Sequence, residues 1–71
     1  MPIRRHYALV PEKVKGGWRI EHAQEFRSRG EAERTSLTLL GRHGTGEAVT
    51  TRDRELTDGH VIDEATLTGK P

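Results

Sequence analysis

The 71-residue chain is long enough for one small domain and carries a net charge of +1. Hydrophobic residues make up 31% and charged residues 32% of it, against typical values of about 45–50% and about 25%, so the apolar side chains suffice for one two-layer core. The absence of cysteine excludes disulfides, thiolate metal sites and cysteine nucleophiles. Because the chain also has no run of roughly 20 apolar residues and no apolar N-terminal leader, we expect a cytoplasmic protein without a membrane partner.

Two strands are predicted at the N-terminus. Tyr7-Ala8-Leu9-Val10 is a short apolar run that ends at Pro11, and because proline is excluded from central strands, we expect the first strand over residues 3–10. The next segment, Trp18-Arg19-Ile20-Glu21-His22, alternates apolar and polar residues with the period of a half-buried strand. The Gly16-Gly17 pair between them predicts an antiparallel hairpin with Trp18 and Ile20 facing the core.

A helix is predicted over residues 29–42. Ser28 is a favourable N-cap, and Glu31 follows three residues later as in a capping box. The segment Thr35-Ser36-Leu37-Thr38-Leu39 also alternates like a strand, which keeps an all-β small barrel as the alternative fold.

Three glycines lie at and just beyond the end of the predicted helix, at positions 41, 44 and 46. A phosphate-binding glycine loop needs the order strand, loop, helix, whereas here the helix comes first and Glu47-Ala48-Val49-Thr50-Thr51 has strand character. We therefore interpret Gly41 or Gly44 as the C-cap of the helix.

The remaining segments complete a single domain over residues 1–71, since no repeat or linker divides the chain. Asp58-Gly59 predicts a hairpin between the strand at 47–51 and residues 60–62, and residues 66–71 are expected to fray. The resulting fold class is α+β, in the order β-β-α-β-β, with one helix packed on an antiparallel sheet. The low apolar content predicts that one face of this sheet stays open.

The spacing of these elements resembles a group of small bacterial and phage domains of unknown function. The similarity covers residues 7–62 with gaps, and it rests on an apolar strand ending in proline, a Gly-Gly-Trp hairpin, a helix start and a closing Asp-Gly hairpin. Those motifs are Tyr7-x-Leu9-Val10-Pro11, Gly16-Gly17-Trp18-x-Ile20, Phe26-x-Ser28-x-x-Glu31-Ala32 and Asp58-Gly59-x-Val61. The resemblance implies the architecture and a prokaryotic or phage origin, and it implies no activity and no functional residues.

The sequence contains no set of residues typical of a catalytic, metal or cofactor site. The four histidines, His6, His22, His43 and His60, lie in separate segments without the clustered spacing of zinc ligands. No glycine-flanked serine resembles a nucleophile elbow, so a non-enzymatic protein without a cofactor is predicted.

Two kinds of partner remain. An excess of Lys and Arg in residues 1–35 and of Asp and Glu in residues 36–71 favours a protein-interaction module that docks on an unidentified protein or self-associates. A phage or mobile-element regulator or inhibitor that binds a host protein is one such module. The alternative is a nucleic-acid-binding protein that uses basic side chains of the N-terminal arm, the first hairpin and the helix start. For either partner the candidate contacts are Arg4, Arg5, Arg19, Arg27, Arg29 and Arg34.

Overall fold

The first two strands form a long antiparallel hairpin in the computed structural model, which describes residues 3–69. Strand β1 (Arg4–Val14) turns into β2 (Gly17–Phe26) through Gly16 and Gly17, whose φ angles of 89° and 154° lie in a region that favours glycine. The hairpin and its Gly-Gly turn are confirmed, but the first strand runs well past residue 10.

The prediction that Pro11 ends the first strand is wrong. β1 lies between β3 and β2, yet β3 pairs with it only over residues 4–9, so β2 is the only strand paired with β1 at Pro11. The pairing of β1 with β2 also shifts register between Val10 and Pro11. A bulge beyond the reach of the third strand is one of the few places in a sheet that accept proline.

Helix α1 (Arg29–His43) follows, and it confirms the helix expected over 29–42 and the α+β fold class in place of the all-β alternative. The Ser28 side chain accepts a hydrogen bond from the Glu31 amide at 3.2 Å. At the other end Gly44, with a φ of 79°, donates its N–H to the Leu40 carbonyl at 2.9 Å. Of the two predicted C-caps, Gly44 is therefore the one that ends the helix, and Gly41 lies within it.

The sheet is completed by β3 (Glu47–Arg52) and the short β4 (Val61–Ile62) in the order β3-β1-β2-β4, with every pair antiparallel. The predicted Asp58-Gly59 hairpin between these two strands is wrong, because they lie on opposite edges of the sheet. Asp58-Gly59 does form a turn, closed by a hydrogen bond from the His60 amide to the Thr57 carbonyl at 3.2 Å. The segment between the strands crosses the sheet and buries Leu56, which an adjacent hairpin would not do.

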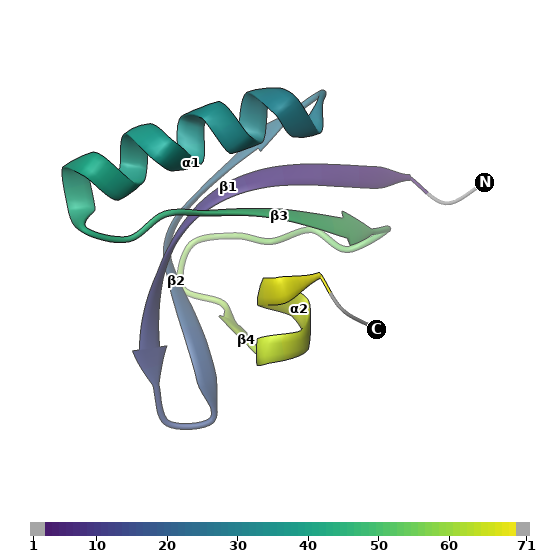
Figure 1. Cartoon of the computed structure of the whole chain (residues 1–71). Coiled ribbons are helices and arrows are strands. Elements are labelled where there is room, and N and C mark those ends of the chain that lie inside the picture. Colours follow the sequence, from purple (N-terminus) through teal and green to yellow (C-terminus); the bar gives the residue numbers. More distant parts are fainter. Residues whose placement is uncertain (1–2, 70–71) are drawn as a thin grey trace.

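Both faces of the sheet are covered, whereas the sequence analysis expected one open face. Helix α1 lies on one face, and the segment after β3 lies with the second helix on the other (Figure 1). On the α1 face, Ala8 and Val10 pack with Leu39 and Phe26. On the opposite face a larger cluster contains Tyr7, Leu9, Ile20, Val49, Leu56, Ile62 and Leu67. Alternate residues of β1 thus enter two separate apolar layers.

Helix α2 (Glu64–Thr68) corrects the expectation that residues 66–71 fray. Asp63 caps it by accepting a hydrogen bond from the Thr66 amide at 2.8 Å, and Leu67 is buried against the sheet. The half-buried Trp18 packs against the same core cluster, and its indole N–H donates to Glu64 Oε2 at 2.6 Å. Residues 70–71 of the predicted tail lie outside the described residues. No helix in the described part of the chain is long and apolar enough to cross a membrane.

Candidate partner-binding groove along strand β3

The sheet has two edges, and the edge at β2 and β4 is largely occupied. The Ile20 amide donates to the His60 carbonyl at 2.8 Å, and the Gly59 amide donates to the Ile20 carbonyl at 2.7 Å. Further along β2, the Ala23 amide donates to Asp58 Oδ1 at 2.9 Å. The turn at residues 57–60 therefore satisfies the groups of β2 that β4 is too short to reach, a common way of blunting a sheet edge.

The edge at β3 is open by comparison. Its six residues pair with β1 alone, and within residues 3–69 no backbone hydrogen bond outside the sheet involves Glu47–Arg52. At about 3.4 Å per residue, six residues present roughly 20 Å of strand edge. Unpaired N–H and C=O groups in such a row form a template for another extended chain.

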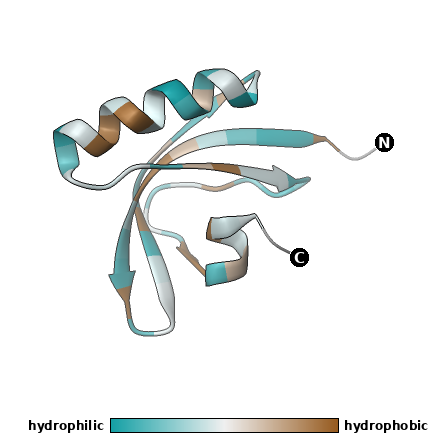
Figure 2. Ribbon diagram, in the orientation of Figure 1, coloured by the Kyte–Doolittle hydropathy of each residue, from teal (hydrophilic) through white to brown (hydrophobic). Residues whose placement is uncertain are grey.

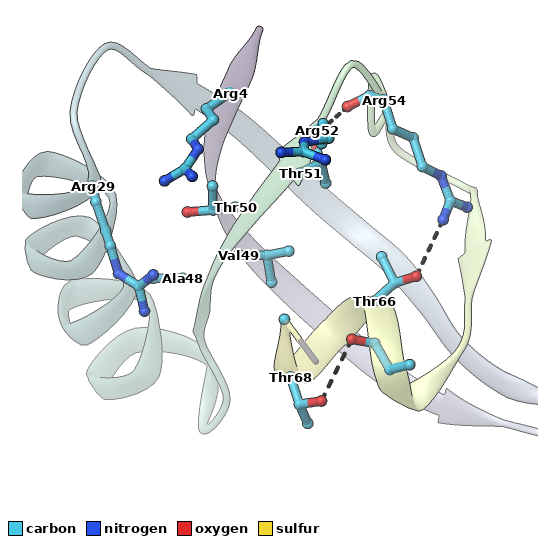
Figure 3. A pocket seen from close by; sticks show the side chains of 12 residues that line it. Arg4, Arg29, Ala48, Val49, Thr50, Thr51, Arg52, Arg54, Thr66 and Thr68 are labelled. Atoms are coloured by element: carbon cyan, nitrogen blue, oxygen red, sulfur yellow. Dashed lines mark hydrogen bonds between the residues drawn. The ribbon is translucent and has the colours of Figure 1, made fainter. Parts of the chain in front are cut away.

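A groove of about 780 Å³ follows this edge, between the start of α1 and helix α2 (Figure 3). Its described lining contains four threonines and no carboxylate. The basic residues of the lining are Arg4, Arg29, Arg52 and Arg54. Figure 2 shows that the start of β1, next to this groove, is hydrophilic. The groove is therefore a positively charged, hydroxyl-lined surface.

The strand register divides the arginines between the two sides of β3. Arg4 lies directly opposite Arg52, and the side chains of opposed residues point to the same face, here the face covered by α1. Arg29 approaches from the first turn of α1 on this side (Figure 3). Arg54 lies on the other side, where it donates to Thr66 Oγ1 of α2 at 3.1 Å.

Asp53 produces this division at the end of β3. Its φ of 57° is unusual for a residue other than glycine, although aspartate tolerates it better than most. The Asp53 amide donates to the Ile3 carbonyl at 2.8 Å, and Asp53 Oδ1 accepts the Ile3 amide at 2.6 Å. These two hydrogen bonds tie the end of β3 to the start of β1 and hold the kink that separates Arg52 from Arg54.

The pairing of Arg4 with Arg52 is unfavourable for the fold. Like charges placed directly opposite each other on neighbouring strands destabilise a sheet. In the described part of the chain neither guanidinium has a carboxylate within 4.0 Å. The protein thus keeps two unneutralised arginines together at its open edge, and such local conflicts concentrate at functional sites.

The six arginines predicted from the sequence do not form one surface. Arg4 and Arg29 line the groove, although Arg29 Nε also donates to Glu33 Oε1 at 2.8 Å. Arg27 and Arg34 are exposed outside the groove lining.

The other two candidates, Arg5 and Arg19, form ion pairs elsewhere. Arg5 is 3.1 Å from Glu25, and the charge of that carboxylate is the main cause that raises the pKa of Arg5. Arg19 Nη2 lies 2.8 Å from both Glu12 and Glu21, and hydrogen bonds to these two carboxylates raise its pKa.

Two groove residues, Arg52 and Arg54, were not among the contacts predicted from the sequence. Both belong to the run Arg52-Asp53-Arg54, which directly follows the predicted strand at 47–51. That position at the end of an edge strand could have drawn attention to them. The opposition of Arg52 to Arg4 depends on the register of β3 with β1, which the sequence pattern does not fix.

The histidines remain apart. Among residues 3–69 no group of three His, Asp or Glu side chains is close enough to hold a metal ion. His6 lies on the α1 side of the sheet, with Nδ1 2.9 Å from Thr50 Oγ1.

Comparisons with known proteins do not identify this chain, since no family model, curated protein or solved structure matches it. The resemblance to bacterial and phage domains of unknown function therefore remains a prediction.

Proposed function

We propose that this protein is a small non-enzymatic interaction module that binds an extended segment of another protein as an additional strand on β3. The observation that carries the proposal is the contrast between the two sheet edges. The edge at β2 and β4 is closed by the turn at 57–60, whereas the edge of Glu47–Arg52 that faces away from β1 has no strand partner among the described residues and borders a groove. Strand addition uses main-chain hydrogen bonds for affinity and side-chain contacts for specificity.

Nucleic acid fits this surface less well. Single-stranded nucleic acids stack on aromatic side chains, and the described lining of the groove contains none. The net charge is only +1, and the carboxylates beside Arg5 and Arg19 neutralise two of the basic groups that would bind phosphates. The unpaired backbone amides and carbonyls along the edge of β3 can form hydrogen bonds with the backbone of another polypeptide.

The kind of partner is inferred from the resemblance to small bacterial and phage domains. A cytoplasmic protein of bacterial or phage origin with this surface would act by occupying a segment of a host protein, as a regulator or inhibitor. This part of the proposal rests on the resemblance of the sequence motifs, while the mode of binding rests on β3.

An NMR titration tests the mode of binding. The ¹⁵N-labelled protein is titrated with capped eight-residue peptides made of four Thr-Glu, Thr-Gln or Thr-Lys repeats, all of which favour extended structure. The proposal predicts that at least one peptide shifts the amide signals of Glu47–Arg52 and slows the hydrogen exchange of those amides that point away from β1, with Asp58 and Gly59 unchanged. If no peptide affects β3, or if the shifts map to the edge at β2 and β4, strand addition at β3 is wrong.

A further inference from the structure

We infer that the segment accepted at β3 is acidic, with carboxylate side chains on the side that faces α1. The inference rests on the proposed function and specifies the chemistry of the partner. It follows from the position of the four groove arginines relative to the open edge.

The α1 side of the edge carries most of the positive charge. Arg52 belongs to β3 itself and Arg4 lies opposite it on β1, whereas the Arg29 side chain extends along α1, where Nε donates to Glu33, and lines the groove on the same side (Figure 3). An added strand would lie about 4.8 Å beyond β3, and its side chains would alternate between the two faces. A carboxylate near Arg52 on the α1 face would therefore meet the cluster of like charges formed with Arg4. Its charge would relieve the repulsion that the unbound sheet retains.

The threonines support the same chemistry. Thr50 lies two residues before Arg52 on the α1 side, with its Oγ1 2.9 Å from His6 Nδ1, and the Thr66 hydroxyl accepts from Arg54 on the α2 side. The Thr68 hydroxyl is already engaged, because it donates to the Glu64 carbonyl at 3.0 Å. Hydroxyl groups and guanidinium groups donate hydrogen bonds to carboxylates. Arg29 is already paired with Glu33, but no carboxylate of the described residues lies within 4.0 Å of the guanidiniums of Arg4 and Arg52, so these two charges are available to a partner.

A second copy of this chain is a poorer occupant. If the β3 edges of two copies paired, the interface would contain two sets of the four groove arginines, and the described lining supplies no carboxylate to neutralise their charge. The arginines have one other physical explanation, which is protection of the edge against aggregation, because charged residues often guard exposed strands. That explanation predicts self-association when they are removed, so the two can be separated by experiment.

The decisive comparison is between the Thr-Glu and Thr-Gln peptides, which differ in charge and hardly in shape. At about 20 mM salt we expect the Thr-Glu peptide to bind the wild-type protein roughly three- to tenfold more tightly, since individual exposed ion pairs are weak. The difference should shrink at about 0.5 M salt, where charges are screened beyond a few Å.

Two matched variants locate the effect. Arg52→Gln should remove most of the preference for the Thr-Glu peptide, whereas Arg34→Gln makes the same charge change on an exposed residue of α1 outside the groove and should keep it. Both variants are first checked for a dispersed spectrum and for their sedimentation behaviour.

Each other outcome contradicts the inference in a distinct way. If the Glu and Gln peptides bind β3 equally, acidic preference is wrong while strand addition stands. If no peptide binds, both proposals fail. If a short DNA duplex or single-stranded RNA binds through Arg52 more tightly than the Thr-Glu peptide, the partner is a nucleic acid. If Arg52→Gln dimerises and the preference is unchanged, the arginines protect the edge and do not select a partner.

Discussion

Gly46 lies where the chain leaves α1 and enters β3, and it provides a sharp test of how the helix is held on the sheet. A Cβ atom built at this position would collide with the Ser36 carbonyl oxygen and would lie 2.7 Å from the Leu40 amide nitrogen. Both are backbone atoms of α1, so no side-chain rotation relieves the clash. Gly46→Ala must therefore push the start of β3 away from the helix.

The cost of that displacement is about 1–3 kcal/mol, the usual range for overpacking a tight contact. For a domain of this size each kcal/mol lowers the melting temperature by about 4–8 °C, so a decrease of roughly 4–24 °C is expected. Gly41→Ala is the matched control, because Gly41 lies within α1 and an added Cβ meets nothing within 4 Å. Alanine is a better helix former by about 0.5–1 kcal/mol, so this variant should melt higher than the wild type.

Thermal and urea unfolding followed by circular dichroism measure both variants. The reasoning is refuted if Gly46→Ala melts within error of the wild type, or if Gly41→Ala loses as much stability as Gly46→Ala. The first result would mean that β3 does not approach α1 so closely, and the second that any added methyl group near the helix end is harmful.

Three further predictions concern other parts of the fold. Arg52→Glu places a negative charge opposite Arg4, so it should raise the free energy of unfolding by about 0.5 kcal/mol and weaken binding of the Thr-Glu peptide. Urea unfolding measures the first effect and NMR titration the second. A loss of stability would contradict the register of Arg52 with Arg4. Leu67→Ala should cost about 2–3 kcal/mol in urea unfolding because Leu67 is buried, and no change would mean that the C-terminal segment is frayed after all. Hydrogen bonding by Thr66 lowers the pKa of Asp63, so its contribution to stability is full above the unfolded value of about 3.9 and is lost as pH falls through the lower folded pKa. Urea midpoints of the wild type and Asp63→Asn should therefore converge at low pH, and a constant difference would exclude this ionisation effect.

The local elements were largely predictable because short-range chemistry determines them. The Gly16-Gly17 turn follows from glycine's access to positive φ, and both ends of α1 follow from Ser28 and Gly44. The extent of β1 was not predictable, because whether Pro11 is tolerated depends on how far β3 reaches along the strand. The partner of β4 was likewise set by the burial of Leu56 under the sheet, a long-range contact that the local Asp58-Gly59 pattern does not reveal.

The candidate groove was predictable only in part. A basic strand-helix region was expected, and Arg4 and Arg29 do line the same groove. Arg5 and Arg19 were expected to contact a partner, but the register of β1 with β2 pairs Arg5 with Glu25 and Arg19 with Glu12. Arg19 also pairs with Glu21, two residues along its own strand. Arg52 is a candidate because Arg4 lies opposite it on β1, so it could be identified only once the pairing of β1 with β3 was known.

Amide hydrogen exchange across β3, measured with and without a saturating Thr-Glu peptide, separates strand addition from attraction by charge alone. Strand addition predicts slower exchange at alternate residues of Glu47–Arg52, because only amides that point outward gain a partner from an added strand. It also predicts no change at the edge formed by β2 and β4. Tight binding of the peptide that leaves exchange in β3 unchanged would show that the groove attracts acidic chains by charge alone, and strand addition would be refuted.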